Sequence, residues 1–518
     1  MTLLENLLTK GYFPKEALSP FSTEKYARAI ANGYDNLPPL FRTGKFISKC
    51  AFHNISRKGT LRRKLGIPNP VNFFRLSETI TENWHDILEC ASKSTISLTT
   101  PDTASNGNRA FNPRFSLNEL PDIHAKLRSK HKYILKTDIS RFYHSIYTHS
   151  IAWTYHTKDI AKKNRSNGLF GNLLDKHLQD SQDGQTIGIP IGPDTSLIIA
   201  ESLLANIDLK LSEKGISSGL RYIDDYFLGF NTIGEAESAL TTMQELLNEY
   251  ELALNPLKTE IIQLPVEFEP LAISELRAFS FRDTIGGQKS DLIHYFNIAF
   301  KAAKDLPTES ILKYAVSRTF EVNVTTENYP VFENFILQCV TADSSTLKYT
   351  VNQLIKYKRI GYIQNIENIS HILRQLSITE SSLGHGNEVA YCLWLYLVLG
   401  ISVPEVVVKN VVPMRDPFVA ILLCDCWQKG LMNFIPDFSI YEEMMVMEEL
   451  SGDMWMFVYE MLAKEWFQPT SNQNPISQNE CYRFLLNSGV FFYNEHLSST
   501  IMAENPIDTD GSVEGFSG

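Results

Sequence analysis

Two adjacent aspartates interrupt an apolar run near the middle of the chain. Asp224 and Asp225 stand in LRYIDDYFLGF, whose flanking residues have the apolar and aromatic character of a strand. Burying two acids in such a strand is unfavourable unless a cation meets them. Because Mg²⁺ prefers carboxylate oxygens as ligands, the run predicts a metal site.

A third acid lies upstream in a similar setting. Asp138 follows the apolar residues Ile134 and Leu135 in KYILKTDISRFY, 86 residues before Asp224. That spacing allows a helical excursion and a return that places two acid-bearing strands side by side. Three such aspartates can hold two Mg²⁺ ions roughly 3.5–4 Å apart, one activating a 3′ hydroxyl and one steadying a leaving pyrophosphate. The predicted chemistry is nucleotidyl transfer, with Asp138, Asp224 and Asp225 as metal ligands.

Two further segments could act on the same substrate. Between the acids, GQTIGIPIGPDTS predicts a tight loop that includes Gly192 and opens onto a helix. A loop whose backbone comes close to a ligand fits the floor under an incoming base pair. After the second acid strand, LNPLKTE carries Lys258, which could protonate or neutralise the departing pyrophosphate, whereas a lone lysine is usually surface charge.

These motifs, in this order, resemble the palm of a reverse transcriptase: TDISRFY, GIPIGPDTS, YIDD and LNPLKTE. Upstream, RRKLGIPNPVNFFRLSETITENW resembles the fingers motif in which an arginine grips the triphosphate. Arg63 falls at that place, with Arg62 and Lys64 beside it. The resemblance covers about the first half of the chain and implies an α/β right-hand polymerase fold. It also implies that Tyr143, five residues after Asp138, is an aromatic gate that selects deoxynucleotides.

One position departs from the common pattern. Retroviral and retron-like enzymes usually have glutamine where this chain has Ile191, and that glutamine helps to position the template. The patterns IPIGPDTSLIIAE and FYHSIYTHSI resemble the abortive-infection (Abi) class of the bacterial unknown-group reverse transcriptases, which are phage-defence proteins. This resemblance implies protein-primed, template-independent DNA synthesis from dNTPs, with the DNA product covalently attached.

The charge is divided unevenly along the chain. The net charge is −11, but residues 1–150 carry 22 Lys and Arg against 12 Asp and Glu. Residues 151–518 carry 26 against 47. The basic part coincides with the predicted fingers, where triphosphate and phosphate backbone would lie. The acidic remainder is poorly suited to wrapping a long duplex.

From about residue 266 the pattern becomes helical. Segments such as LKYTVNQLIKY and EVAYCLWLYLVLGI have apolar residues at helical spacing with polar or Gly/Pro breaks between them. We expect an all-α, helical-repeat (HEAT-like) domain over residues 266–500, after reverse-transcriptase-like fingers and palm over residues 1–265. The repeat region also resembles the part that follows the polymerase in Abi-class proteins. Residues 501–518 are acidic and glycine-rich, which predicts a disordered tail.

Composition indicates a large cytoplasmic protein. The seven cysteines show no metal spacing, and the longest apolar run, around residues 392–403, is too short to span a bilayer. The N-terminus lacks a basic start and a cleavage site, so no secretory signal is expected. We expect a homo-oligomer built by the helical array, of a size that the sequence does not give.

Several alternatives stay open. One is an RNA-templated reverse transcriptase of the retron or intron type, and another is a helical scaffold with an inactive polymerase fold. Tyr12, beside Gly11, is a weak candidate for the priming hydroxyl, since aromatic residues in an N-terminal arm usually pack. His385 is expected to cap or pack against a helix and not to take part in chemistry.

Overall fold

The structure of the protein is a computed structural model. It describes the following residues: 2–57, 61–102, 109–115, 119–471 and 473–497. The acidic tail predicted at residues 501–518 lies outside these ranges. Within them, no helix is long and apolar enough to cross a bilayer.

The acid-bearing segments meet in one four-stranded antiparallel sheet with the strand order β6-β7-β5-β8. The strands are β5 (Tyr133–Asp138), β6 (Gly219–Tyr222), β7 (Asp225–Phe230) and β8 (Glu260–Gln263). Leu135 and Leu228, which are register partners on β5 and β7, are fully buried. The same pairing places Asp138 opposite Asp225. The prediction that two acid strands lie side by side is therefore confirmed.

The run LRYIDDYFLGF is not one strand, contrary to the sequence prediction. β6 ends at Tyr222, the chain turns at Ile223 and Asp224, and β7 begins at Asp225. Ile223 has a φ of 55°, a left-handed conformation that is rare for a β-branched residue. No glycine, proline or Asn-Gly pair marks this turn in the sequence, so it was not recognised. The turn brings both acids to the same end of the sheet.

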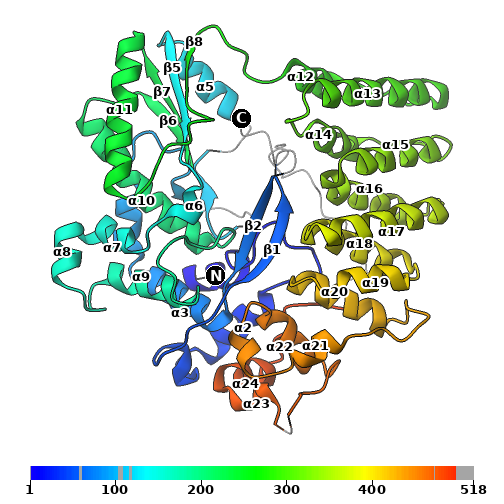
Figure 1. Cartoon of the computed structure of the whole chain (residues 1–518). Coiled ribbons are helices and arrows are strands. Elements are labelled where there is room, and N and C mark those ends of the chain that lie inside the picture. The colour runs from blue at the N-terminus through cyan, green and yellow to red at the C-terminus, as the bar shows by residue number, and fades with distance from the viewer. Residues whose placement is uncertain (1, 58–60, 103–108, 116–118, 472, 498–518) are drawn as a thin grey trace.

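Two long helices share a core with the sheet, and the first of them was predicted from the sequence. α10 (Asp194–Glu213) follows the Gly/Pro loop, and α11 (Ile233–Glu249) follows β7. α11 begins with a capping box in which the Thr232 hydroxyl and the Glu235 carboxylate each accept the other residue's backbone N–H. α11 packs against β5 and β7, and α10 lies beside α11 (Figure 1).

The remaining elements of the first half are mostly short. The helices are α1 (Leu3–Lys10), α2 (Glu24–Gly33), η1 (Tyr34–Asn36), η2 (Pro39–Phe41), α3 (Pro70–Glu82), α4 (Trp84–Ala91), α5 (Leu120–Arg128), α6 (Phe142–Ser145), α7 (His149–His156), α8 (Lys158–Lys163) and α9 (Phe170–Asp180). Two antiparallel ribbons are β1 (Ala51–Ser56) with β2 (Arg62–Ile67), and β3 (Pro101–Asp102) with β4 (Asn112–Pro113). We name residues 51–67, with their arginines and lysines, the basic hairpin. It stands between the four-stranded sheet and the second half of the chain (Figure 1).

The described residues from 271 onward form helices. These are α12 (Leu271–Ala278), α13 (Ile285–Asp305), α14 (Ile311–Arg318), η4 (Thr319–Glu321), α15 (Tyr329–Ala342), η5 (Ser344–Thr346), α16 (Leu347–Arg359), α17 (Ile366–Ser382), α18 (Gly386–Leu399), α19 (Glu405–Val411), α20 (Pro417–Gln428), α21 (Ser439–Glu443), η6 (Glu448–Ser451), α22 (Trp455–Ala463), α23 (Pro475–Gln478) and α24 (Glu480–Asn487). They stack as a column from green to red in Figure 1. We name residues 271–487 the helical half.

Two hydrophobic cores divide the molecule, and they do not follow the order of the chain. One core joins the sheet to α10 and α11, and includes Leu135, Ile199 and Leu247. The other joins the helical half to residues near the N-terminus, such as Tyr12 and Phe73. The domain boundary at residue 265 stays a prediction. The packing does not follow it strictly, because the N-terminal arm packs with the second half of the chain.

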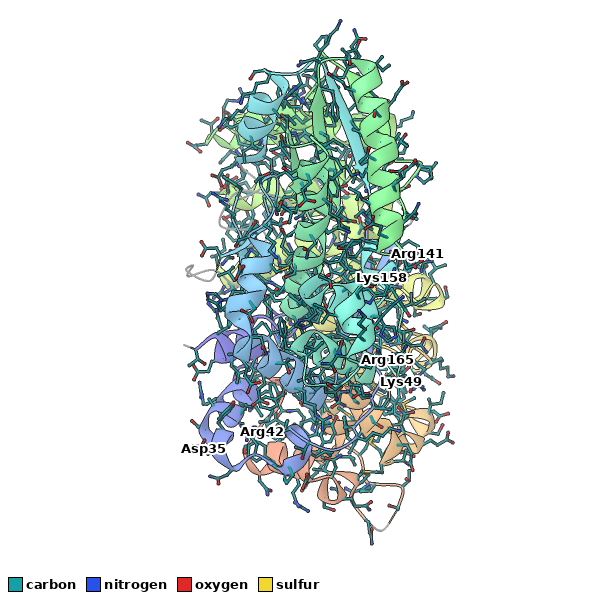
Figure 2. All side chains as sticks on the ribbon, turned by 90° about the vertical axis from the view of Figure 1, so that its left-hand side faces the viewer. Asp35, Arg42, Lys49, Arg141, Lys158 and Arg165 are labelled. Carbon is teal, nitrogen blue, oxygen red and sulfur yellow. The ribbon has the colours of Figure 1, made fainter. Side chains whose placement is uncertain are left out.

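Part of the basic charge lies on the outer face of the first half. In Figure 2, Arg141, Lys158, Arg165 and Lys49 follow one edge of that face. Lys158 is exposed and its ammonium lies 4.3 Å from the ring centre of Trp153. Lys49 and Arg141, which belong to residues 1–150, show that the basic surplus of that part is not confined to the basic hairpin.

Candidate nucleotidyl-transfer site

The three predicted aspartates lie at one end of the sheet. Asp138 ends β5 and is 5% exposed, while Asp225 begins β7 directly opposite. Asp224 lies in the turn before Asp225 and is half-buried. The three aspartates that were predicted to lie close together are thus brought to one place by the strand register and by one turn.

Lys258 reaches these acids from the segment before β8. Its Nζ lies 2.6 Å from Asp138 Oδ2 and 3.7 Å from Asp225 Oδ1. The segment is fixed to the end of β5, because the backbone N–H and the side-chain amide of Asn255 donate to the carbonyl and carboxylate of Asp138, at 2.8 and 3.2 Å. A lysine at this position can meet developing negative charge beside the acids.

The electrostatics of the acids indicate a demand for positive charge. Burial, together with the neighbouring charge of Asp138, raises the pKa of Asp224 to about 6. Burial and the charge of Asp224 also raise the pKa of Asp225. The hard carboxylate oxygens suit a divalent cation, and the ammonium of Lys258 lies between two of them as a cation would. The donor set therefore fits the divalent metals that reverse transcriptase domains use.

A buried ion network holds the turn that carries Asp224. The Arg221 guanidinium donates to the backbone carbonyl of Ile223 at 3.0 Å, and the Ile223 N–H donates to Thr99 Oγ1 at 3.2 Å. Arg221 also binds Glu201 with two hydrogen bonds, at 2.8 and 3.0 Å, and Asp208 with one at 2.8 Å. All three charged side chains are almost completely buried. Both backbone polar groups of Ile223, its N–H and its carbonyl, are thus hydrogen-bonded, which holds the residue in its left-handed conformation.

Sequence reasoning missed this network, although the sequence contains a signal for it. Glu201 and Asp208 stand seven residues apart in α10, which places both acids on one face of the helix, and most of the residues around them are apolar. Arg221 is a charged residue on a short strand directly before the acids. Buried charges on adjoining elements require partners, so these three residues could have been paired.

Tyr143, the predicted sugar gate, lies close to the acids. It is on α6, five residues after Asp138, and its ring packs 5.3 Å from the ring of Phe142. Burial and the nearby charge of Asp224 raise the pKa of its hydroxyl, whereas the charge of Arg63 acts in the opposite direction. Tyr143 is therefore placed between the acids and the basic hairpin.

The glycine-rich loop is held by contacts within the protein. Gly192 has a φ of 126°, and a Cβ there would lie 2.7 Å from the ring of Pro14. Its carbonyl accepts a hydrogen bond from Arg109 at 2.8 Å. The carbonyl of Ile191 accepts from the Gly66 N–H at 2.8 Å, which joins the loop to β2. These contacts account for Gly192, and its contact with substrate stays a prediction.

The three basic residues of the fingers motif have different surroundings. Arg62 is bound to Glu388 of the helical half, and the Lys64 ammonium lies 3.5 Å from the ring centre of Phe52 on its own hairpin. Arg63 makes no hydrogen bond or ion pair with the side chains that the structure describes. Of the three, Arg63 is thus the residue whose guanidinium can meet a ligand.

The N-terminal tyrosine is not a priming residue. Tyr12 is 0% exposed, and its hydroxyl donates to the carbonyl of Pro68 at 2.7 Å. Its ring stacks on Phe73 with centroids 4.0 Å apart. The expectation that an aromatic residue of the N-terminal arm packs is confirmed, and the weak alternative that Tyr12 starts synthesis does not fit a hydroxyl that is inside the core and already bonded.

Among the described residues, two groups of potential metal ligands have ligand atoms that all lie within 4.8 Å of one another, and neither includes the three aspartates. One is exposed and consists of His85, Asp86 and Glu89, and the other consists of Glu380, His385 and Glu388. In the second group His385 binds Glu380 at 2.6 Å, and Glu388 is already paired with Arg62. His385 occupies the N-cap position of α18, but its side chain makes no capping hydrogen bond and pairs with Glu380 instead.

One comparison with known proteins, the scan against family models, agrees with this geometry. Residues 76–273 match the family described as reverse transcriptase (RNA-dependent DNA polymerase). Among solved structures, the protein is similar to telomerase from Candida albicans in complex with a TWJ fragment of telomeric RNA, with 11% identity and a TM-score of 0.29. That alignment covers 66% of this chain and 67% of the other. No curated protein matches. The chain contains a reverse transcriptase domain and is a nucleotidyltransferase of the RNA-directed DNA polymerase type.

Proposed function

We propose that the protein is a DNA polymerase of the reverse-transcriptase type that serves in abortive-infection defence against phage. In this proposal, synthesis starts from a hydroxyl of the protein itself and proceeds without a template. The observation that carries the catalytic part is the convergence of Asp138, Asp224 and Asp225 with Lys258 at one end of the sheet. The defence role, protein priming and template independence rest on the resemblance to the Abi class.

Each residue of the site has a defined task in the proposed reaction. Asp138, Asp224 and Asp225 would hold Mg²⁺, which when bound makes a 3′ hydroxyl more acidic and offsets charge on the pyrophosphate. Lys258 carries a proton at Nζ that it can donate to the departing pyrophosphate. Arg63 meets the triphosphate from the basic hairpin. The ring of Tyr143 lies under the deoxyribose and excludes a 2′ hydroxyl.

Template independence is supported by Ile191. An isoleucine side chain has no polar atom with which to position a templating strand, whereas the glutamine usual in retroviral and retron-like enzymes does. The loop around Ile191 is also hydrogen-bonded to Gly66 of the basic hairpin. The acidic character of residues 151–518 further disfavours a long template along the helical half.

The helical half has a separate role in the proposal. We infer that α12 to α24 form an irregular helical repeat that shapes the path of the DNA product and builds a homo-oligomer. Extended arrays of paired helices provide the large surfaces that such contacts need. Light scattering of the purified protein measures the oligomer directly, and a monomeric mass would contradict this part.

A second candidate function is RNA-templated DNA synthesis. The observation that favours it is the match of residues 76–273 to a family described as RNA-dependent DNA polymerase. The two candidates differ in what must be added to the enzyme, since the second needs a template and an annealed primer.

The test is incubation of the protein with labelled dNTPs and Mg²⁺ alone, followed by denaturing gels. The proposal predicts label that migrates with the protein, is shortened by nuclease and becomes free DNA after protease treatment. Mass mapping of the peptide left after nuclease then identifies the priming hydroxyl. Free product that forms only with an RNA template and annealed primer would establish the second candidate instead.

The defence role is tested in bacterial cells. Expression of the chain should lower the plating efficiency of sensitive phages, and Asp224→Ala should abolish this protection at equal protein level. Protection that persists in the Asp224→Ala variant would show that synthesis is not needed, as expected of a helical scaffold with an inactive polymerase fold.

A further inference from the structure

The basic hairpin is joined to the proposed site through the glycine-rich loop. The Gly66 N–H on β2 donates to the carbonyl of Ile191 at 2.8 Å, and the Ile189 N–H of the same loop donates to the carbonyl of Tyr143 at 2.8 Å. Arg57 directly follows β1, and Arg63 stands on β2, three residues before Gly66. The orientation of this hairpin therefore decides where the charge of these two arginines lies relative to the site.

A two-stranded ribbon of this size does not fix its own orientation. β1 and β2 pair over six residues each, from Ala51 opposite Ile67 to Ser56 opposite Arg62. An isolated two-stranded hairpin is only marginally stable in water. The position of Arg57 and Arg63 must therefore depend on what the hairpin packs against.

The first anchor of the hairpin is an ion pair with α18. Arg62 donates to both carboxylate oxygens of Glu388, at 2.9 and 2.5 Å, and its Nε donates to Asn54 Oδ1 at 2.6 Å. The Glu388 side chain is 0% exposed. A buried carboxylate that is bound by two parallel hydrogen bonds allows little freedom to the arginine that binds it.

The second anchor is a buried pair between β1 and the N-cap residue of α20. His53 Nδ1 is 2.7 Å from Asp416 Oδ2, and both side chains are buried. Asp416 is itself fixed as the N-cap of α20, where its other oxygen accepts the backbone N–H groups of Phe418 and Val419. The close approach requires Gly386, since a Cβ there would lie 2.0 Å from Asp416 Oδ2.

Two further hydrogen bonds also join β1 to the helical half. The Asn54 amide donates to the carbonyl of Gly384 at 2.8 Å, and Lys313 Nζ donates to Ser56 Oγ at 3.0 Å. β1 thus contacts three separate places in the helical half, on α14, before α18 and at the start of α20.

We propose that Glu388 and Asp416 are positioning residues for the incoming nucleotide, which act by fixing the basic hairpin so that Arg63 meets the triphosphate. This inference rests on the proposed function in taking Arg63 as the triphosphate ligand. It assigns to the helical half an indirect part in nucleotide binding, exerted through the basic hairpin, in addition to its proposed role in shaping the product path.

The test compares Glu388→Gln with Glu333→Gln. Glu333 is a buried glutamate of α15 that accepts from the Asn365 N–H and has no hydrogen bond or ion pair with the hairpin residues that the structure describes, so its variant controls for a general loss of stability. Two measurements are made on each full-length protein. They are hydrogen exchange of residues 51–67 and calorimetric binding of the α,β-imido analogue of dATP in Mg²⁺, which the enzyme cannot turn over.

Glu388→Gln should speed exchange in the basic hairpin, leave β5 and β7 unchanged, and weaken analogue binding about 10- to 100-fold. In dNTP incorporation, KM should rise by a similar factor with kcat within about threefold of wild type. Arg62→Gln should behave in the same way, and the double variant should be no worse than either single variant. Glu333→Gln should change neither hairpin exchange nor binding.

Unchanged hairpin exchange or unchanged binding in Glu388→Gln would overturn the proposal, and so would equal effects in Glu333→Gln. Wild-type protein that does not bind the analogue would overturn the proposed function, and nucleotide positioning with it. Hydrogen exchange would then still decide whether Glu388 fixes the hairpin, so the two failures are distinguishable.

Discussion

The acid-bearing turn and the basic hairpin differ in how far along the chain the residues that hold them lie. Arg221, which holds the turn, has its partners Glu201 and Asp208 only 20 and 13 residues away, within the same core. In the basic hairpin, Arg62 binds Glu388, which lies 326 residues later in the chain, and His53 binds Asp416, which lies 363 residues later. The proposed metal-binding part of the site is therefore built locally. The part proposed to bind triphosphate depends on the helical half.

Removing an acid should have the largest effect. Asp138→Ala or Asp224→Ala loses a proposed metal ligand, so dNTP incorporation should fall by at least about 1000-fold. The melting temperature should not fall, because each change relieves repulsion between buried carboxylates. Asp35→Ala, at an exposed aspartate on the outer face in Figure 2, is the matched control. Incorporation near the wild-type rate in either variant would contradict the assignment of the site.

Removing the local support of the turn should have the next largest effect. Arg221→Met leaves Glu201 and Asp208 buried without their cation, which should lower the free energy of unfolding by about 3–5 kcal/mol. Urea unfolding of the variant measures this loss. Arg165→Met, at an exposed arginine, should change the same quantity by less than about 0.5 kcal/mol. A loss below about 1 kcal/mol for Arg221→Met would mean that the network does not stabilise the turn.

Tyr143 lies between the two regions and tests whether they act on one nucleotide. Tyr143→Ala opens space for a 2′ hydroxyl, so the preference for dNTPs over rNTPs should fall about 10- to 100-fold. The measurement is the ratio of kcat/KM for the two substrates. Tyr147→Ala is the control, because that ring contacts His149 and Trp153 instead. Discrimination that stays unchanged in Tyr143→Ala would place the gate elsewhere.

The pair between His53 and Asp416 should make the stability of the protein depend on pH. This is the smallest of the four effects predicted in this section. Burial lowers the pKa of His53, but the charge and hydrogen bond of Asp416, with smaller contributions from Asn387 and Glu388, raise it above 6.5 overall. The pair therefore stabilises the fold fully below pH 6.5, and this stabilisation is lost as the pH rises through the folded-state pKa.

Asp416→Asn tests this dependence, since asparagine can still cap α20 and only the charge is removed. The difference in unfolding free energy between wild type and variant should be larger at pH 5.5 than at pH 8.5. It should stay below the loss expected for Arg221→Met. An equal difference at both pH values would mean that His53 is not charged in the folded protein.

Much of the acid site could be predicted from the sequence because its signals are local. The apolar flanks of Asp138 and of the YIDD run predict adjoining strands, and Lys258 follows at a short, defined distance. The turn at Ile223 was missed since its conformation is imposed by Arg221 and Thr99, not by a turn-forming residue. At Ile223, buried hydrogen bonds outweigh the preference of a β-branched residue for a negative φ.

The environment of the basic hairpin could not be predicted in this way. Helical periodicity shows that α18 has an apolar face, but not that Glu388 at its start pairs with Arg62. Contacts between residues more than 300 positions apart leave no pattern in a single sequence. Packing of Tyr12 was the favoured expectation, but the sequence did not show that its partners would include the helical half.

Intact-protein mass spectrometry tests the central proposal most directly. Purified wild-type protein is incubated with dATP and Mg²⁺ alone, beside the Asp224→Ala variant. The account predicts that the wild-type mass increases in steps of one deoxyadenylate, that nuclease shortens this series, and that the variant keeps its original mass. A wild-type protein that shows no added mass, and makes free DNA only on an RNA template with a primer, would contradict protein-primed, template-free synthesis.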